Sequence, residues 1–591
     1  MGKTFVEKVL DAEHGAIVFR RPDIVLTHDN TASIKVTFEK MAGKKVANPD
    51  QLLVVLDHNA PPTDAKLANQ YQSVRDFVKD QEVVRFHDIA QGICHQLMGR
   101  YAKPGMIIVG SDSHTCTAGA FNALAAGIDR TEAAGIWKRG ETWMRVPESL
   151  KVTLTGALRA GVYAKDLSLW IIGMIGSAGA NYMSIEFHGE GVKTLSMAQR
   201  MTLANLASEM GAKNAVFPAD KVLEEFLGER VERPVWADAD AHYEREIEIN
   251  LDELYPLVAA PHHVDNVKAV SEVQGTKVEM GLIGTCTNGR LEDIRIAAEI
   301  LDGKKIGNGF QLLVIPASRD IYLQALKEGL LEKIINAGGI VLAASCGPCL
   351  GTGQGIPADG YTVISTANRN FKGRMGNPNA RIFLASPACV AMSAIAGEIV
   401  NPCPESGGNI FPYTKKQSTS VNINAADNRR SNGVWNYTDV DNLNTDQMFA
   451  GNLTYQVLSS DAEAILPHLF KGFDDHFSEN VQAGDVVVAG ENFGCGSSRE
   501  HPAVGLAHAG VKAVIVKSVN RIFYRSAVNQ GLPIIVMPEV FNIYNAGDRL
   551  EISLDKGVVE IAGKEFKFAP LPDELMEIFA AKGLVNWAKE H

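Results

Sequence analysis

The sequence predicts an α/β protein with several domains. Short apolar runs rich in β-branched residues alternate with amphipathic stretches over the first 400 residues. Strands separated by helices are typical of layered α/β folds with parallel or mixed sheets. The chain has 591 residues, of which 46% are hydrophobic and 21% charged, enough for three or four domains, each with its own core.

The clearest strands of the first part are expected at 51–56, 105–109 and 310–315. A further run at 280–283 precedes an amphipathic helix that starts near Leu291, and the run at 339–344 predicts a buried strand followed by a tight turn. Active groups in such folds lie on the loops that follow the carboxyl ends of strands. We therefore expect the site on these loops.

The amino-acid composition changes after residue 400. Proline, glycine and polar residues dominate 401–433, which predicts a linker. We expect a catalytic core over 1–400 and a second α/β domain over 434–591. The strands of this second domain are predicted at 485–489, 513–516 and 533–536, and a C-terminal helix from about Asp573.

Composition narrows the possible partners and compartments. A net charge of −12 over this length disfavours nucleic acid. The longest apolar stretch, 167–180, is too short to span a bilayer, and the N-terminus has no secretory pattern. Eight scattered cysteines fit a reducing compartment. We expect a monomer with no membrane partner, in the cytoplasm or the mitochondrial matrix.

Three cysteines stand at predicted strand ends. Cys346 and Cys349 flank a Gly-Pro turn, and Cys286 follows the run at 280–283. A C-x-x-C pair alone fits a zinc site, a redox pair, part of an iron–sulfur cluster or two buried thiols. With Cys286, three corners of a cubane cluster are available, and an open fourth iron would act as a Lewis acid. Zinc and an electron-transfer cluster remain alternatives. The other cysteines have no required role and are listed here: Cys94, Cys116, Cys389, Cys403 and Cys495.

With these loops, several ordered motifs make the chain resemble a known family. They are Leu56-Asp57-His58-Asn59, Gly92-Ile93-Cys94-His95-Gln96, Gly110-Ser111-Asp112-Ser113-His114-Thr115, Glu186-Phe187-His188-Gly189, Asn368-Arg369-Asn370-Phe371 and Gly496-Ser497-Ser498-Arg499-Glu500-His501. The chain resembles the aconitase superfamily, and within it the 3-isopropylmalate dehydratase and homoaconitase branch. The resemblance implies three α/β domains around a [4Fe-4S] cluster and a mobile swivel domain, here fused through residues 401–433.

The resemblance also implies a role for each motif. It places one [4Fe-4S] cluster per chain on Cys286, Cys346 and Cys349. It assigns Ser497 as the base, although its position alone equally suggests a helix N-cap. The proton relay to the leaving hydroxyl would be Asp57, His58, Asp112 and His114, and His95 and Glu186 would lie near the open iron and its bound water. The substrate-binding residues would be His28, Arg369, Arg374, Ser498 and Arg499. Asn288 and Asn368 are expected beside the cluster.

We therefore expect a hydro-lyase that reversibly dehydrates and rehydrates a 2-hydroxy di- or tricarboxylic acid, such as 3-isopropylmalate, 2,3-dimethylmalate or a homocitrate-like acid. Relatives carry an arginine near the end of the loop at 441–454, where this chain has Asn452-Leu453-Thr454. Without that cation we expect an uncharged substituent. Alternatives are an aconitate hydratase acting on citrate, an RNA-binding regulator of the same family and a ferredoxin-like electron carrier.

Overall fold

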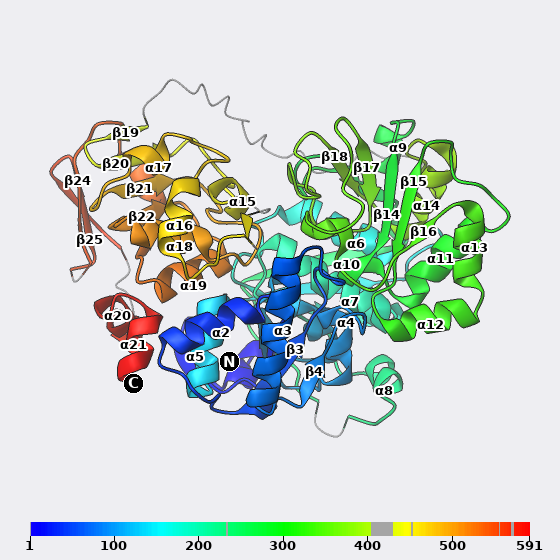
Figure 1. Ribbon diagram of the computed structural model, residues 1–591, viewed down its shortest axis with the longest axis horizontal. Helices are drawn as coiled ribbons and strands as arrows, with labels where there is room; N and C mark the ends of the chain where they lie inside the picture. Colours follow the sequence, from blue (N-terminus) through cyan, green and yellow to red (C-terminus); the bar gives the residue numbers. More distant parts are fainter. Residues whose placement is uncertain are drawn as a thin grey trace.

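The structure, a computed structural model, describes residues 2–231, 234–403, 429–450, 453–454, 456–554, 556–568 and 573–591. It confirms the predicted fold class, because the four largest sheets are wholly or mainly parallel and helices connect their strands (Figure 1). Parallel sheets of this kind are buried by the helices that connect their strands.

The first sheet has five parallel strands in the order β4-β3-β2-β5-β6. Its strands are β2 (Ile24–Thr27), β3 (Leu52–Val55), β4 (Arg85–His87), β5 (Ile107–Gly110) and β6 (Leu124–Gly127), and its main helices are α2 (Thr31–Lys40), α3 (Ala65–Asp80) and α5 (Arg130–Arg139). The predicted strands at 51–56 and 105–109 are therefore present, each displaced by a residue or two.

The second sheet has four parallel strands in the order β10-β9-β8-β11. Its elements are β8 (Ser149–Thr155), β9 (Ser184–His188), β10 (Asn214–Val216) and β11 (Arg245–Asn250), with α6 (Ala164–Ile175) and α7 (Met197–Leu206). Its core is continuous with part of the first sheet, since Leu26 and Val55 cluster with Leu150 and Phe187.

The third sheet has seven strands in the order β13-β12-β18-β17-β14-β15-β16, of which the first three are β13 (Val267–Ala269), β12 (Leu257–Ala259) and β18 (Arg381–Leu384). The site-bearing strands are β14 (Met280–Gly284), β15 (Gln311–Ile315), β16 (Ile340–Val341) and β17 (Thr362–Ser365), and α11 (Leu291–Leu301) starts where the sequence predicts. The buried strand predicted at 339–344 is wrong: β16 has two residues at the sheet edge, and Ile340 is 44% exposed.

The C-terminal sheet has the order β19-β20-β21-β22-β23. Its strands are β19 (Arg430–Ser431), β20 (Val434–Tyr437), β21 (Val486–Ala489), β22 (Ala513–Val516) and β23 (Ile534–Val536), with α15 (Thr445–Met448), α18 (His501–His508) and α19 (Arg521–Asn529). The sheet thus begins by Arg430, before the boundary expected at 434. Most of the predicted linker, 404–428, lies outside the described residues.

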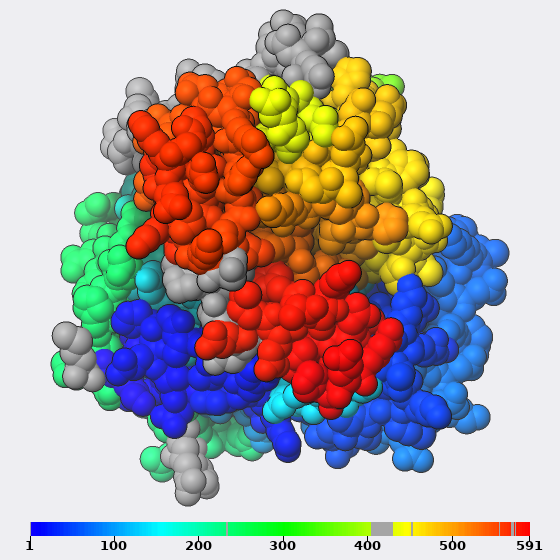
Figure 2. All heavy atoms as spheres, turned by 90° about the vertical axis from the view of Figure 1, so that its left-hand side faces the viewer, coloured from blue at the N-terminus to red at the C-terminus, as the bar shows by residue number. Residues whose placement is uncertain are grey.

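The last two helices of the chain pack on the N-terminal part. Helices α20 (Asp573–Ala580) and α21 (Leu584–Glu590) lie beside α5 (Figure 1), and in Figure 2 the red C-terminal residues lie against the blue N-terminal ones. Leu584 and Trp587 share a core cluster with Trp137 and Trp143. The expected single helix is therefore two, and both complete the core of the first sheet.

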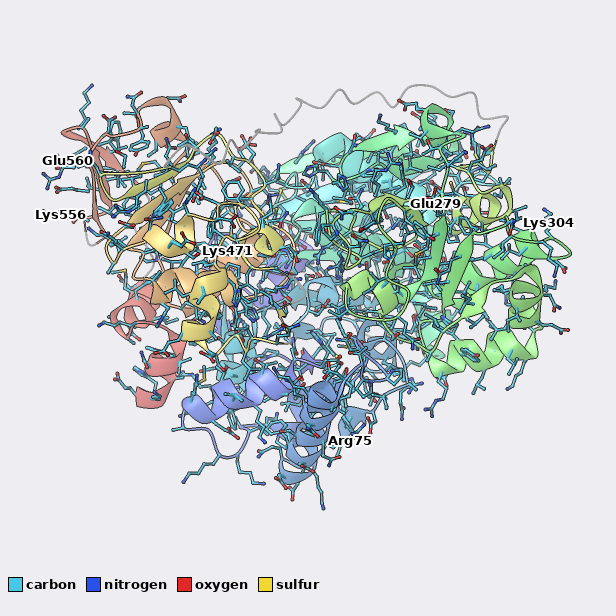
Figure 3. All side chains as sticks on the ribbon, turned by 45° about the horizontal axis from the view of Figure 1, so that its top comes forward. Arg75, Glu279, Lys304, Lys471, Lys556 and Glu560 are labelled. Atoms are coloured by element: carbon cyan, nitrogen blue, oxygen red, sulfur yellow. The ribbon has the colours of Figure 1, made fainter. Side chains whose placement is uncertain are left out.

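Charged side chains are divided between the surface and the interior. Lys304, Lys556 and Glu560 point outward at the periphery (Figure 3), whereas Glu132 and Arg525 are buried between the N- and C-terminal parts. Among the residues that the structure describes, every helix is too short or too polar to cross a lipid bilayer.

Candidate active site

The site is a cavity where strand ends from three sheets meet. Loops after β2, β3 and β5 face the loops after β14, β16 and β17, and the loop after β21 closes the cavity from the C-terminal part. Because parallel strands place their carboxyl ends at one edge, chemistry-bearing loops converge there. The cavity has an empty volume of about 800 Å³, measured to its open mouth.

The three predicted cysteines line this one cavity. Cys286 and Cys349 are buried, and none of the three forms a disulfide. Nδ2 of Asn368 lies 3.5 Å from the Cys286 sulfur, and Nη2 of Arg374 lies 3.6 Å from the Cys349 sulfur. Burial and the neighbouring Cys349 raise the pKa of the Cys286 thiol to about 11, so a bound cation is needed to keep it as a thiolate at neutral pH.

Nδ2 of Asn205, on α7, also lies 3.4 Å from the Cys286 sulfur, and the sequence analysis missed this residue. The expectation for Asn288 is wrong, because its Nδ2 instead donates to Asp293 at 2.8 Å, beside the start of α11.

Asp112 is the centre of a histidine network in the same cavity. Its Oδ1 lies 2.8 Å from His95 Nε2 and accepts from the His114 backbone N–H at 2.8 Å, while its Oδ2 lies 3.5 Å from His58 Nε2. Burial acts to raise the pKa of Asp112, but the hydrogen bonds from His114, His58 and His95 together hold it well below its ordinary value. The carboxylate is therefore ionised and can orient three imidazoles.

His58 lies between two carboxylates. Its Nδ1 is 2.7 Å from Asp57 Oδ1, and Asp57 Oδ2 accepts from the Cys94 N–H at 2.6 Å. Desolvation acts to lower the pKa of His58, but the Cys346 sulfur, Asp57 and Asp112 raise it well above its ordinary value. Asp57 does not line the cavity itself; it holds His58, which does.

Glu186 lies away from the cavity, and the carboxylate that contacts the cavity residues His114 and Arg369 from behind is Glu209. Glu186 lies in β9, where it accepts from the Phe5 N–H at 2.8 Å and the Tyr243 hydroxyl at 2.9 Å, and it does not line the cavity. Glu209 lies 2.8 Å from His114 Nε2 and 2.9 Å from Arg369 Nε. The expected placement of Glu186 near the open iron is therefore wrong, because Glu186 does not line the cavity that holds the three cysteines.

Although burial opposes it, the charges of Arg369 and His114 lower the pKa of Glu209 to about 2. Glu209 belongs to the short helix Ala207–Met210, which directly follows α7. No strand-end pattern marks that position, so only the three-dimensional arrangement reveals it.

Ser497 lies on the loop between β21 and α18 and lines the cavity with Ser498 and Arg499. Helix α18 begins at His501 with Glu500 as its N-cap residue, so Ser497 is not a helix cap. Its Oγ lies 3.3 Å from the Thr445 hydroxyl. Arg499 is paired with Asp446, and the neighbouring loop residue Asn452 lies outside the described part.

Most of the site residues expected from the sequence therefore come together. Those that line the cavity are His28, His58, His95, Asp112, His114, Cys286, Cys346, Cys349, Arg369, Arg374, Ser497, Ser498 and Arg499. Three thiols facing imidazole–carboxylate pairs, a serine and several arginines define a class: an α/β enzyme with a thiol-lined centre for the acid–base chemistry of small acids.

Comparison with known proteins identifies the family. The sequence model of the aconitase family (aconitate hydratase) matches residues 3–397, and that of the aconitase C-terminal domain matches residues 413–539. The chain belongs to the aconitase family, and the enzyme is a hydro-lyase.

Named relatives cover about two thirds of the chain. The 3-isopropylmalate dehydratase large subunit 1 of Methanopyrus kandleri is 44% identical over 416 residues, 68% of this chain and 100% of that protein. Large subunit 2 of Archaeoglobus fulgidus is 47% identical, over 68% of this chain and 99% of its own length. A probable methanogen homoaconitase large subunit of Methanosarcina mazei is 45% identical, over 64% and 98%.

Among solved structures, a crystal structure of 3-isopropylmalate dehydratase from Methanocaldococcus jannaschii is 41% identical in sequence. It covers 25% of this chain and 88% of its own chain. The TM-score is 0.24, too low to bear on the arrangement of the parts.

Proposed function

We propose that the chain reversibly dehydrates and rehydrates a 2-hydroxy di- or tricarboxylic acid and holds a [4Fe-4S] cluster on Cys286, Cys346 and Cys349. The observation that carries the proposal is the meeting, in one cavity, of these thiols with Ser497 and the Asp112 network. Zinc or electron transfer alone would not require such an acid–base wall.

The residues present fit such a cluster. The thiols share one wall, and amide and guanidinium donors reach two of the sulfurs, at 3.5 Å and 3.6 Å. Donors of this kind stabilise negative charge on sulfur. When bound, the cluster would supply a Lewis acid for the substrate's oxygen atoms.

On the proton-donating side, His114 and His95 are the proposed acids for the departing hydroxyl. Asp112 orients both rings, and Glu209 holds Nε2 of His114 at 2.8 Å. A carboxylate on one ring nitrogen fixes the orientation of the imidazole. We propose that His58 and Asp57 complete this relay, as His58 is 3.5 Å from Asp112.

On the other side, we propose Ser497 as the base that removes a proton from the carbon next to the hydroxyl-bearing carbon. Its hydroxyl lies on the cavity wall, and the Thr445 hydroxyl 3.3 Å away can donate to an alkoxide there. Arg374, Arg499 and Ser498 are the proposed ligands of the substrate carboxylates, since a guanidinium fork matches a carboxylate in charge and geometry. Arg369 is held by Glu209 and Ser113, so it shapes this wall as well.

The domain arrangement is also a proposal. Relatives that match about two thirds of this chain over nearly their whole length are named large subunits, whereas this chain also holds the C-terminal part that carries Ser497. We propose that residues 434–591 act as the swivel domain in the same chain. A monomer would then hold every group of the site.

The names of the relatives point to 3-isopropylmalate and homocitrate as candidate substrates. 2,3-Dimethylmalate is a related acid, and citrate is a further candidate. The test is anaerobic reconstitution with iron and sulfide, followed by the absorbance of the enoate formed from each acid. We expect turnover of at least one of them. An enzyme that binds the cluster but dehydrates none of the four would contradict the proposal.

A further inference from the structure

We propose that Arg521, a residue that does not line the cavity, positions the proposed acid His114. From helix α19 of the C-terminal part, Arg521 holds together the two segments whose carboxylates flank the His114 ring. The inference rests on the proposed function, because it takes His114 as the acid for the departing hydroxyl. It adds a positioning residue from the part of the chain that also carries the proposed base, Ser497.

One face of α19 is polar and buried against the N-terminal part of the chain. Helix α19 lies beside α5 (Figure 1), and Arg521, Arg525 and Asn529 recur every four residues along it, which places them on one side of the helix. Nδ2 of Asn529 donates to Asp129 at 2.7 Å, and Arg525 pairs with Glu132. These two contacts fasten α19 to α5, whereas Arg521 reaches the loops of the site.

Arg521 contacts two of these loops with one nitrogen atom. Its Nη2 donates to the Ser113 carbonyl and to the Ser208 hydroxyl, each at 3.2 Å, and the Ser208 hydroxyl donates to the same carbonyl at 3.0 Å. Ser113 directly precedes His114. Ser208 directly precedes Glu209. One guanidinium group therefore connects two segments that are 95 residues apart in the sequence.

The spacing of the two segments decides how the His114 ring is held. Oδ1 of Asp112 lies 3.4 Å from His114 Nδ1, and Oε1 of Glu209 lies 2.8 Å from His114 Nε2. The ring is thus held between one carboxylate from each segment. If the segments separate, at least one of these contacts lengthens, and a misplaced ring donates poorly to the departing hydroxyl.

In the described part of the chain, no carboxylate pairs directly with Arg521, in contrast to Arg525. The Nη2 of Arg521 bonds to a carbonyl and a hydroxyl, and its Nη1 is buried without a hydrogen bond among the described residues. Burial lowers the pKa of Arg521, whereas Glu132 raises the pKa of Arg525 against the effect of burial. An unpaired buried cation lowers the stability of a fold. The presence of Arg521 is therefore better explained by the site than by docking of the helix.

The first experiment compares Arg521→Met and Arg521→Lys with Asn529→Ala in the reconstituted enzyme, on the acid that the wild type turns over fastest. Asn529→Ala is the matched control, because it removes a contact of the same helix face and leaves Ser113 and Ser208 untouched. We expect Arg521→Met to lower kcat at least ~10-fold and to change KM less than ~3-fold, since a misplaced acid slows the chemical step and leaves substrate binding intact.

Arg521→Lys should recover part of the lost kcat, because an ammonium group can still donate to the Ser113 carbonyl. Asn529→Ala should keep the wild-type kcat, and the iron content should be equal in all variants. Full turnover by Arg521→Met would overturn the proposal. An equal loss of kcat in Asn529→Ala would also overturn it, because docking of α19 alone would then explain the effect.

Hydrogen–deuterium exchange of the reconstituted protein does not depend on turnover. We expect faster amide exchange over 112–117 and 207–211 in Arg521→Met than in the wild type or in Asn529→Ala, because the connection between the two segments is lost. Unchanged exchange over both segments refutes the positioning role. Faster exchange in Arg521→Met, together with a wild type that turns over none of the four acids, refutes the proposed function alone.

Discussion

Glu132 of α5 and Arg525 of α19 form an ion pair in which both side chains are 1% exposed. Arg525 also stacks on the Trp143 ring at 3.6 Å and donates to the Trp143 carbonyl at 2.7 Å. The pair joins residues 393 positions apart and fastens the C-terminal part to the N-terminal part. A domain that moves over the site must therefore move around this contact or break it.

Removing one partner of this pair should destabilise the protein strongly. We expect Arg525→Met to lower the free energy of unfolding by about 3–5 kcal/mol, because the Glu132 carboxylate is left buried and unpaired. Urea denaturation measures the loss. The double variant Glu132→Leu with Arg525→Met should recover most of it, and a double variant as unstable as the single one would contradict this account.

The cysteine assignment predicts joint loss of cluster and activity. Cys286→Ser, Cys346→Ser and Cys349→Ser should each abolish the visible absorbance of the reconstituted cluster, lower bound iron and remove turnover, because three protein thiolates are needed. Cys389→Ala is the matched control: this cysteine is buried in the core of the third sheet, away from the cavity. A Cys389 variant that loses iron equally, or a Cys346 variant that keeps it, would speak against the assignment.

Ser497→Ala should lower the rate of catalysis and leave binding of the cluster unchanged. Loss of a general base costs roughly 10²- to 10⁴-fold in kcat, while cluster absorbance and iron content should stay at wild-type values. Ser460→Ala, outside the cavity lining, serves as the control. Full turnover by the Ser497 variant would exclude it as the base.

Glu209 and Glu186 provide a paired test of the corrected carboxylate. Glu209→Gln should lower kcat at least ~10-fold, because Gln cannot supply the carboxylate that orients the His114 ring and Arg369. Glu186→Gln keeps hydrogen-bonding atoms beside Phe5 and Tyr243 and should retain activity. The reverse result would restore the sequence-based placement.

Asp129 predicts a pH dependence of stability. Burial, with Glu500 and Glu132 nearby, raises its pKa to about 7, against about 3.9 in an unfolded chain. The folded state keeps a proton that the unfolded state loses, so this contribution is fully present below pH ~4 and is lost as the pH rises towards about 7. Denaturation midpoints between pH 4.5 and 7.5 should fall less for Asp129→Asn than for the wild type. Parallel curves would contradict the shifted pKa.

The sequence predicted the fold class and most of the cavity wall, because strand-end loops carry recognisable local patterns. Cys286, Asp112 and Ser497 all follow apolar runs that became strands. The residues that the sequence analysis missed share a physical cause. Glu209 lies at the end of a helical stretch and contacts the cavity residues His114 and Arg369, and Arg130 lies at the start of a helix. Packing between sheets brings both to the site. The length and the burial of the edge strand β16 were overestimated, because apolar composition does not distinguish an edge strand from a buried strand.

The packing of α20 and α21 on α5 has a consequence for synthesis. Leu584 packs beside Gly135, and Arg139 stacks on Trp587 at 4.3 Å, so part of the apolar wall of the N-terminal core is made of residues translated long after α5. While the ribosome works through the intervening chain, that wall is missing, and the nascent N-terminal part exposes the surface that these helices later cover. The core of this part is therefore complete only once residues 573–591 are present to cover it.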